Sequence, residues 1–441
     1  MGSELIPLHN DGIFKNLPTF SPEIQGLTAI VTGANGISGF ATLRVLLQSP
    51  HRWRKVWALS RSPPPPEMMA LLTLEQRQRV EYLAINFLEK PEKIGQILKD
   101  NGVTANAIFF YSYFQPKSEE KGVQLGPNAR EPCDVNIELI SNFLDALPLA
   151  NIQPARFLLQ TGAKNYNVHQ GPARTPYVES DPRNNLEPNF YYPQEDKLFA
   201  YCKEHPGTGW NVICPAWIIG VVSNGAMNVF PPLAVYAAVQ AHKGEALHFP
   251  GDYGAYLFTF EHSTAMLTGY LSEWAVLEDK CQNQKFNASD GCPLPHNRLW
   301  PELARWYGCA GSTGPELDAS KITTVDAGDV PTPLGYGPSY KTRFAWTLCE
   351  WAKKSENHDV WKKIMSEHGL MQDPFEDVEG SFFYGDLVAW GLGVQLSMNK
   401  ARYFGFTGHV DTLESIFWTY GELSKMKLLP PLKVAKASPL I

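Results

Sequence analysis

Short, mostly apolar runs alternate with stretches of helical periodicity along the first half of the chain. The apolar runs are rich in β-branched and aromatic residues, as in strands that are buried on both faces of a parallel sheet. Six of them predict strands, at residues 27–31, 55–60, 80–85, 107–112, 156–160 and 210–220. Apolar residues recur at helical spacing between them, at residues 40–48, 71–79 and 133–147. This alternation predicts an α/β fold with a doubly wound, Rossmann-type parallel sheet and ligands at the carboxyl ends of its strands.

The turn after the first strand is rich in glycine: residues 32–39 read TGANGISG, and a helical stretch follows. Glycines permit a tight turn, allow the backbone to approach a pyrophosphate and let the helix lie close to the strand. A strand, a glycine turn and a helix in this order favour a dinucleotide site over a glycine-rich turn without a ligand. The contacts expected here are Thr32, Gly33, Asn35, Gly36, Ile37 and Gly39.

The second strand ends in Ser60, Arg61 and Ser62, where sites for NAD usually carry a carboxylate that binds the ribose hydroxyls. A guanidinium and two hydroxyls suit a 2′-phosphate instead, so the sequence predicts NADPH rather than NADH. The alternative is a solvated surface arginine. Further cofactor contacts are expected at later turns and strand ends: Asn86, Phe87, Tyr111, Ser112, Thr161, Gly162, Pro215, Ala216, Trp217, Ile218, Ser223 and Met227.

The pattern changes beyond residue 222, where helical stretches such as 229–239 and 299–307 are separated by irregular, aromatic-rich segments. These segments predict a smaller, mostly helical C-terminal lobe that covers the cofactor and binds the substrate. We expect an N-terminal arm on the surface at 1–23, an NADP-binding Rossmann domain at 24–224 and a substrate-binding lobe at 225–441. Within 245–290 the chain is expected to recross to the Rossmann sheet.

Composition narrows the class of protein. With 441 residues, 44% hydrophobic content and 19% charged content, the chain is typical of a soluble globular protein. A net charge of −7 without a long basic run argues against a nucleic-acid partner. The seven scattered cysteines form no C-x-x-C pair, and no apolar window is long enough to span a membrane. We expect a cytoplasmic protein without a metal, and a homodimer is left open.

The segment at residues 189–197, NFYYPQEDK, contains a candidate acid/base tyrosine but lacks the usual lysine. In short-chain dehydrogenases that lysine follows the tyrosine by one helical turn. Here Glu195 stands four residues after Tyr191, and Asp196 four after Tyr192. A carboxylate could only raise the pKa of the phenol. Lys164, just past the fifth strand, is the best candidate for the missing cation, although a buried core tyrosine and a solvated lysine are the plainer interpretations.

These motifs, LQTGAKNY at 159–166 and NFYYPQED at 189–196 above all, resemble the progesterone 5β-reductase and iridoid synthase (PRISE) group of extended short-chain dehydrogenases/reductases. Shorter similarities follow at 227–228, 249–251, 286–287 and 397–400. The resemblance implies that Lys164 replaces the missing lysine and that Tyr192, the second of the pair, is catalytic. Which of Tyr191 and Tyr192 acts stays open if the register is off by one.

Some positions depart from the group's usual pattern. Cys214 stands where a basic residue is common, Asn86 where an aspartate is common, and residues 382–384 read FFY where tryptophans are common. Substrate identity therefore cannot be carried over from the group. The substrate pocket is expected to include Tyr113, Phe114, Tyr166, Tyr191, Phe383 and Tyr384.

The expected activity is an NADPH-dependent oxidoreductase of secondary metabolism that reduces an activated C=C bond, an enone, in a 1,4 manner. The partner is a small, apolar, carbonyl-containing substrate of terpenoid, steroid-like or polyketide-like character. Tyr192 would donate to the carbonyl oxygen, where negative charge develops, and Lys164 would lower the pKa of this phenol. The same residues would serve carbonyl reduction of a ketone or aldehyde, which is the alternative. An NADPH-binding sensor without turnover is the alternative of another class.

Overall fold

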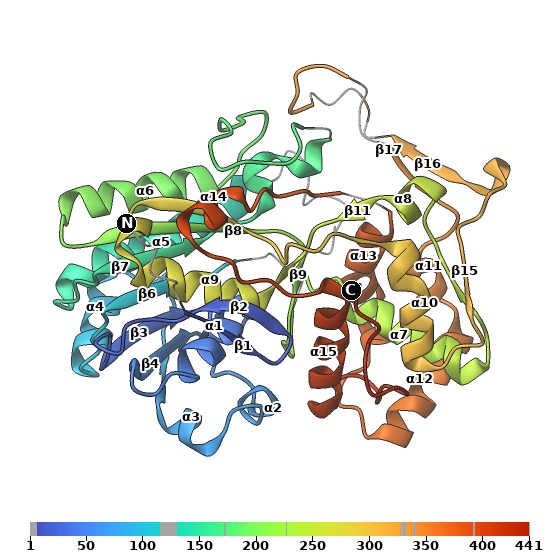
Figure 1. Cartoon of the computed structure of the whole chain (residues 1–441), viewed down its shortest axis with the longest axis horizontal. Coiled ribbons are helices and arrows are strands. Elements are labelled where there is room, and N and C mark those ends of the chain that lie inside the picture. The colour runs from blue at the N-terminus through green and yellow to red at the C-terminus, as the bar shows by residue number, and fades with distance from the viewer. Residues whose placement is uncertain are drawn as a thin grey trace.

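The computed structural model describes residues 7–114, 130–171, 173–225, 227–326, 328, 332–337, 341–390 and 393–440. Its main feature is a seven-stranded sheet with the order β13-β8-β7-β6-β3-β4-β5, in which each neighbouring pair is parallel (Figure 1). The strands are β3 (Leu27–Thr32), β4 (Trp53–Ser60), β5 (Val80–Ala84), β6 (Ala107–Phe110), β7 (Arg156–Gln160), β8 (Gly209–Pro215) and β13 (Gln284–Ala288). The predicted Rossmann-type α/β fold is confirmed.

Helices cover both faces of this sheet because successive strand side chains point to opposite faces. In β3, Ile30 belongs to one hydrophobic core and Val31 to the other, and both are fully buried. One face carries α1 (Ile37–Leu47) and α9 (Ala265–Leu277), and the other carries α4 (Pro91–Asp100), α5 (Arg130–Leu149) and α6 (Tyr191–Glu204). The short helices α2 (Pro66–Met69) and α3 (Leu74–Gln78) lie between β4 and β5.

The strand order reverses at β3, which pairs with β4 on one side and with β6 on the other. In open α/β sheets, ligands bind at the carboxyl ends of the strands beside such a reversal. The glycine turn leaves β3 at this point and leads into α1. The fold therefore places the segment 32–39 where a dinucleotide is expected.

The C-terminal region packs beside the sheet as a mainly helical lobe (Figure 1). Its helices are α7 (Pro231–Lys243), α8 (Tyr253–Leu257), α10 (His296–Tyr307), α11 (Leu348–Ala352), α12 (Ser355–His368), α13 (Val378–Ala389) and α15 (Thr412–Lys425). The short helix α14 (Asn399–Phe404) instead packs against β13 of the Rossmann sheet (Figure 1). Four short ladders complete it: β9 (Ile218–Ile219) with β12 (Ser263–Thr264), β10 (Leu247–His248) with β15 (Ser312–Thr313), β11 (Thr259–Phe260) with β14 (Leu294–Pro295), and β16 (Thr323–Asp326) with β17 (Lys341–Phe344). The chain returns to the Rossmann sheet at β13, after α9.

The N-terminal segment has more order than its sequence predicts. It forms a hairpin of β1 (Leu8–Asp11) and β2 (Phe14–Pro18), in which Phe14 and Leu17 are buried. The Phe14 ring packs 5.5 Å from the ring of Tyr270 and 6.0 Å from that of Trp418. Two anchoring side chains are too few to produce a visible period in the sequence, yet they fix the hairpin between α9 and α15.

The predicted strand at 210–220 is divided in two. β8 ends at Pro215, and β9 leaves the main sheet to pair with β12. Between them Trp217 has a φ of 43°, a left-handed conformation that bulky residues rarely adopt. No helix in the described parts of the chain is long and apolar enough to cross a membrane, and these parts contain no cluster of three metal-ligating side chains.

Candidate active site

The glycine turn has the geometry that a pyrophosphate site requires. Gly33 has a φ of +60°, and a β-carbon there would lie 2.9 Å from the carbonyl oxygen of Tyr111. A β-carbon on Gly39 would overlap the carbonyl oxygen of Gly33, so only glycine allows α1 to begin this close to the turn. Gly36 caps α1 without a side-chain hydrogen bond, and no acidic residue occupies its first turn. The positive end of α1 is thus not neutralised by a capping side chain or an acidic residue, as a phosphate site requires.

The end of β4 is held against this turn by a hydrogen bond between the Asn35 and Ser62 side chains. Ser60 Oγ donates to the carbonyl oxygen of Ser62 at 2.7 Å, and Asn35 Nδ2 donates to Ser62 Oγ at 3.2 Å. Arg61, between the two serines, is exposed. The Ser62 hydroxyl thus lies beside the glycine turn, and the exposed Arg61 precedes it in the chain.

Thr32 joins the carboxyl ends of β3 and β6, where the strand order reverses. Its Oγ1 accepts hydrogen bonds from the backbone N–H groups of Tyr111, at 3.0 Å, and Ser112, at 3.1 Å. The phenol of Tyr111 accepts a hydrogen bond from the Thr42 hydroxyl at 2.7 Å, and burial raises its pKa to about 12. The ring of Tyr111 is therefore part of the packing against α1, and its backbone carbonyl faces the glycine turn.

The remaining residues expected around the adenosine end are dispersed. Phe87 is buried and packs its ring on those of Phe110 and Phe143, with centroids 6.0 and 4.9 Å apart. Asn86 is exposed, and its Oδ1 accepts a hydrogen bond from the Leu88 backbone. On the lobe side, Met227 is exposed. Ser223 Oγ donates to Glu67 Oε1 at 2.6 Å, which joins the loop after β9 to α2.

The carboxyl ends of β7 and β8 form the edge where a nicotinamide is expected. The backbone N–H of Thr161 donates to the carbonyl oxygen of Ile213 at 2.9 Å, so this edge continues past both strands. Ala216 follows β8, and its N–H donates to Ser263 Oγ at 2.8 Å. Trp217, with its left-handed backbone conformation, comes next, immediately before the β9–β12 ladder.

The two tyrosines of α6 point to different surroundings. Tyr192 is buried, and its hydroxyl donates to the carbonyl oxygen of Asn165 at 2.6 Å while accepting from the Asn184 backbone at 2.9 Å. Burial raises the pKa of Tyr192, and the Arg183 guanidinium lies 5.1 Å from its ring. The hydroxyl that the sequence favoured is thus engaged on both sides within the protein.

Tyr191 instead reaches the carboxyl edge of the sheet. A β-carbon added to Gly162 would lie 2.9 Å from Tyr191 Oη and 3.6 Å from the carbonyl oxygen of Pro215. Burial raises the pKa of Tyr191 well above its ordinary value, with Tyr113 and Cys214 nearby. The phenol is therefore protonated at neutral pH, and it stands where β7 and β8 end.

Lys164 lies two residues beyond Gly162, in the 3-10 turn η3 (Ala163–Tyr166). Burial lowers the pKa of its amine, and the neighbouring Glu187 and Cys133 act in the opposite direction. Asn189 Nδ2 donates to the backbone carbonyl of Lys164 at 2.8 Å, and Asn189 Oδ1 accepts from the backbone N–H of Tyr191 at 3.1 Å. A single asparagine thus connects the lysine turn to the start of the tyrosine helix.

Part of the expected substrate pocket comes together around Tyr191. Tyr113 packs its ring 5.7 Å from that of Phe190, and the nearby Tyr384 of α13 contributes to a raised pKa of the Tyr113 phenol, which burial dominates. Phe383 neighbours Tyr384 on the same helix. The Rossmann sheet and the helical lobe therefore both contribute aromatic rings to this region.

Two other expected pocket residues are used differently. The ring of Tyr166 stacks on Tyr177 with centroids 5.2 Å apart, and its hydroxyl donates to Asn287 Oδ1 at 2.7 Å. The backbone of Phe114 exchanges two hydrogen bonds with the Asn136 side chain, at 2.8 and 2.9 Å. Tyr166 is thus a member of a small core behind the site, and Phe114 is fixed chiefly through its backbone.

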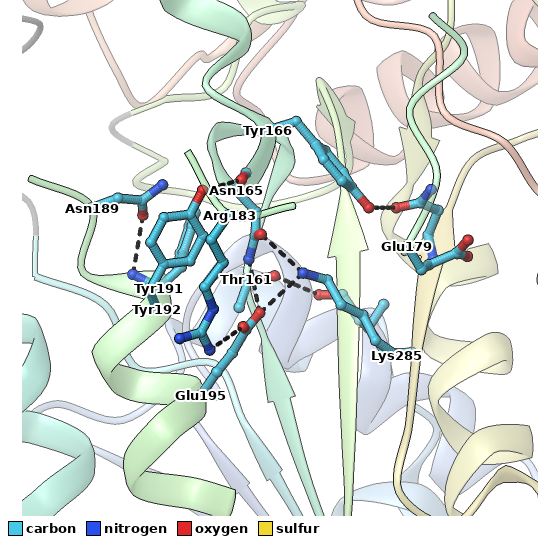
Figure 2. Close-up of polar contacts among 12 residues, drawn as sticks. Thr161, Asn165, Tyr166, Glu179, Arg183, Asn189, Tyr191, Tyr192, Glu195 and Lys285 are labelled. Carbon is cyan, nitrogen blue, oxygen red and sulfur yellow. Dashed lines mark hydrogen bonds and ion pairs between the residues drawn. The ribbon is translucent and has the colours of Figure 1, made fainter. Parts of the chain in front are cut away.

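The structure also reveals an ionic cluster that the sequence did not indicate. Glu195 is buried, and its carboxylate accepts hydrogen bonds from Asn165 Nδ2 at 2.8 Å, Lys285 Nζ at 3.1 Å and Arg183 Nη2 at 2.9 Å. Figure 2 shows Glu195 between the two cations, directly below Asn165. Because the partners come from separate parts of the chain, no local motif could have identified them.

Comparisons with known proteins show to which family the chain is similar. A family model described as "PRISE-like Rossmann-fold domain" matches residues 29–326. The chain is 29% identical to the short chain dehydrogenase gsfE of Penicillium aethiopicum, over 91% of this chain and 99% of that protein. It is 27% identical to an (S)-8-oxocitronellyl enol synthase of Nepeta cataria (92% of each chain) and 25% identical to the 3-oxo-Delta(4,5)-steroid 5-beta-reductase of Arabidopsis thaliana (91% and 93%).

Proposed function

Because the chain belongs to the PRISE-like Rossmann-fold family, we propose that it is an NADPH-dependent reductase of a C=C bond conjugated to a carbonyl group. It is an oxidoreductase of the extended short-chain dehydrogenase kind, with a nicotinamide cofactor and a small-molecule substrate. The preference for NADPH, the alkene as target and the residues involved are the parts that we propose. One observation carries the proposal most: the protonated Tyr191 phenol lies at the edge between Gly162 and Pro215.

The proposed chemistry follows from where charge develops. NADPH, when bound, supplies the hydride that the β-carbon of the alkene accepts. Negative charge then accumulates on the substrate's carbonyl oxygen, and a hydrogen-bond donor aimed at that oxygen stabilises the transition state more than the ground state. Tyr191 is the donor in this account, and the enolate that results takes a proton from water at its α-carbon to give the saturated ketone. Lys164, in the turn two residues beyond Gly162, would supply the positive charge that favours the ionised phenol as the proton is shared with the substrate.

Tyr191 is preferred to Tyr192 here, in contrast to the expectation from the sequence. The hydroxyl of Tyr192 has one proton, and that proton is engaged by the Asn165 carbonyl at 2.6 Å. To serve a substrate, it would have to leave a buried carbonyl oxygen without its donor, which costs about 1–3 kcal/mol. The Tyr191 hydroxyl faces no such cost at the edge of the site. Tyr192 is thus assigned to holding η3 against α6.

NADPH is favoured over NADH by the chemistry at the end of β4. The exposed Arg61 and the hydroxyl of Ser62 are suitable partners for a 2′-phosphate, and no carboxylate occupies residues 60–62. The remaining cofactor contacts are proposed as the sequence predicted them, with Tyr111 acting through its backbone. The domain limits at residues 24–224 and 225–441 and a cytoplasmic location, in keeping with unpaired cysteines, are likewise proposals.

The substrate is proposed to be small and apolar, with terpenoid, steroid-like or polyketide-like character. The printed names of two relatives include an enol synthase acting in the 8-oxocitronellyl series and a reductase of 3-oxo-Delta(4,5)-steroids, which is consistent with this class. The same tyrosine could instead protonate an alkoxide after hydride transfer to a carbonyl carbon. Carbonyl reduction is therefore the second candidate, and an NADPH-binding sensor is the third.

Product analysis distinguishes these candidates. The protein is incubated with NADPH and a mixed panel of enones and simple ketones, and the products are identified by mass spectrometry and NMR. A saturated ketone formed from an enone supports the proposal. An allylic alcohol, or reduction of the simple ketones alone, replaces it with carbonyl reduction. Tight NADPH binding without any product favours the sensor.

A further inference from the structure

Glu195 occupies an unexpected position for a buried carboxylate. It stands one helical turn after Tyr191, where short-chain dehydrogenases usually carry lysine, and only 3% of its surface is exposed. A buried carboxylate is costly unless it is paired and hydrogen-bonded. Glu195 meets this condition through one carboxamide and two cations, which together occupy both of its oxygens.

Lys285 is the more buried of the two cations. Its side chain is 16% exposed, whereas that of Arg183 is 36% exposed and also pairs with Asp196 at 2.8 Å. The Lys285 ammonium donates to Asn165 Oδ1 at 2.9 Å as well as to Glu195. It comes from β13, the edge strand that joins the sheet only after the chain has left it. The charge thus reaches α6 from a distant segment (Figure 2).

Asn165 connects this cluster to η3, the turn that carries Lys164. It directly follows Lys164 in η3, and its carboxamide bonds both Glu195 and Lys285. Its backbone carbonyl accepts the Tyr192 hydroxyl. Asn165 is therefore held by two contacts from α6, through Glu195 and Tyr192, and by one contact from β13, through Lys285.

We propose that Lys285 and Glu195 are positioning residues, which fix η3 against α6 and thereby set Lys164 relative to Tyr191. The inference rests on the proposed function for its catalytic consequence. In this arrangement Glu195 occupies the helical position that carries the lysine in short-chain dehydrogenases, and it anchors the turn that carries Lys164 instead. Lys285 also balances the charge of Glu195, a carboxylate that acts to raise the pKa of the Tyr192 phenol.

Removing one charge of the Lys285–Glu195 pair should disturb η3 more than removing both charges together. Lys285→Met leaves Glu195 with only the exposed Arg183 as its cation, so the carboxylate and Asn165 must move to find water. A displacement of even about 1 Å at a reacting group is enough to reduce turnover about 100-fold. Glu195→Gln combined with Lys285→Met removes both charges while keeping an amide that can bond Asn165 and Arg183.

The test compares Lys285→Met, Glu195→Gln, the double variant and the conservative Lys285→Arg with the full-length wild type. Lys280→Met is the matched control, since Lys280 forms an exposed pair with Glu278 at 3.6 Å near the same strand. The measurements are kcat and KM for an enone, NADPH affinity, and hydrogen exchange at the amides of Asn165 and Asn167. Those amides donate to Gly162 and Lys164 carbonyls within the turn.

We expect Lys285→Met to lower kcat at least about tenfold with NADPH affinity unchanged, and the double variant and Lys285→Arg to recover most of the loss. Amide exchange at Asn165 and Asn167 should accelerate in Lys285→Met alone, while β7 amides stay protected. An unchanged kcat in Lys285→Met, or a double variant as impaired as the single one, overturns the inference. If the wild type reduces nothing, the proposed function fails, and the exchange rates still decide whether Lys285 holds the turn.

Discussion

The Tyr192 hydroxyl donates a 2.6 Å hydrogen bond to the backbone carbonyl of Asn165, the residue that follows Lys164. This bond joins α6 to the turn that carries the lysine, and it engages the only proton of that phenol. The adjacent Tyr191 lies at the sheet edge beside Gly162. We therefore propose separate tasks for the two tyrosines: Tyr192 holds η3 against α6, and Tyr191 takes part in the chemistry.

Tyr191→Phe is expected to lower kcat about 100- to 1,000-fold, the usual effect of removing one donor to a developing oxyanion. NADPH binding, followed by fluorescence titration, should be retained. Tyr192→Phe should instead lower the free energy of unfolding by about 1–3 kcal/mol, because the Asn165 carbonyl loses its donor. A Tyr192→Phe variant that is stable but inactive, beside an active Tyr191→Phe variant, would contradict this division of roles.

The pH dependence of turnover should report Lys164. Burial lowers the pKa of its amine below the ordinary 10.5, so the charge that assists Tyr191 is present at low pH and is lost as pH rises through this lowered value. The profile of kcat against pH should therefore fall on its basic side below pH 10.5. Lys164→Arg should move this fall to higher pH, because a guanidinium stays charged. Lys164→Met should abolish most turnover at every pH, and full activity in that variant would remove Lys164 from the site.

Arg61→Glu should weaken NADPH binding at least about tenfold while leaving NADH binding nearly unchanged, since a carboxylate repels the 2′-phosphate and accepts ribose hydroxyls. Dissociation constants for both cofactors, measured at one ionic strength, check this outcome. Arg77→Glu, in the neighbouring α3, is the matched charge-reversal control. Equal losses for the two cofactors in Arg61→Glu would show that Arg61 does not meet the 2′-phosphate.

Stability should depend on pH through Asp290, which is buried between β13 and α15. Burial raises its pKa from 3.8 to about 7, although Thr264 and Thr412 donate hydrogen bonds to it. The folded state therefore binds more protons than the unfolded state between these values, and the contribution of Asp290 to stability is lost as pH rises through 7. Urea unfolding of the wild type and Asp290→Asn, at pH 5 and pH 7.5, should give a steeper decline for the wild type. Parallel declines would contradict the shift.

The sequence was sufficient for the parts of the fold that depend on local pattern. The strand at 156–160 was predicted with the bounds that the structure gives to β7, because its apolar run is uninterrupted. The glycine turn was equally clear, since Gly33 and Gly39 are required by local crowding. The family resemblance is confirmed by the match over residues 29–326.

Local sequence patterns could not predict which charged residues of the site are buried and paired. Glu195 and Asp196 look equivalent in the sequence, yet the first is buried between two cations and the second is exposed. Lys285 stands 90 residues from Glu195, and only the parallel pairing of β13 with β8 brings it to α6. The choice between Tyr191 and Tyr192 likewise depends on side-chain directions that differ by about 100° around a helix.

The position of hydride transfer tests the central claim most directly. The protein is given an enone and NADPH deuterated at both C4 positions, and the product is analysed by NMR. The account predicts a saturated ketone with one deuterium on the former β-carbon and none on the carbonyl carbon. Deuterium on the carbonyl carbon of an allylic alcohol would contradict it.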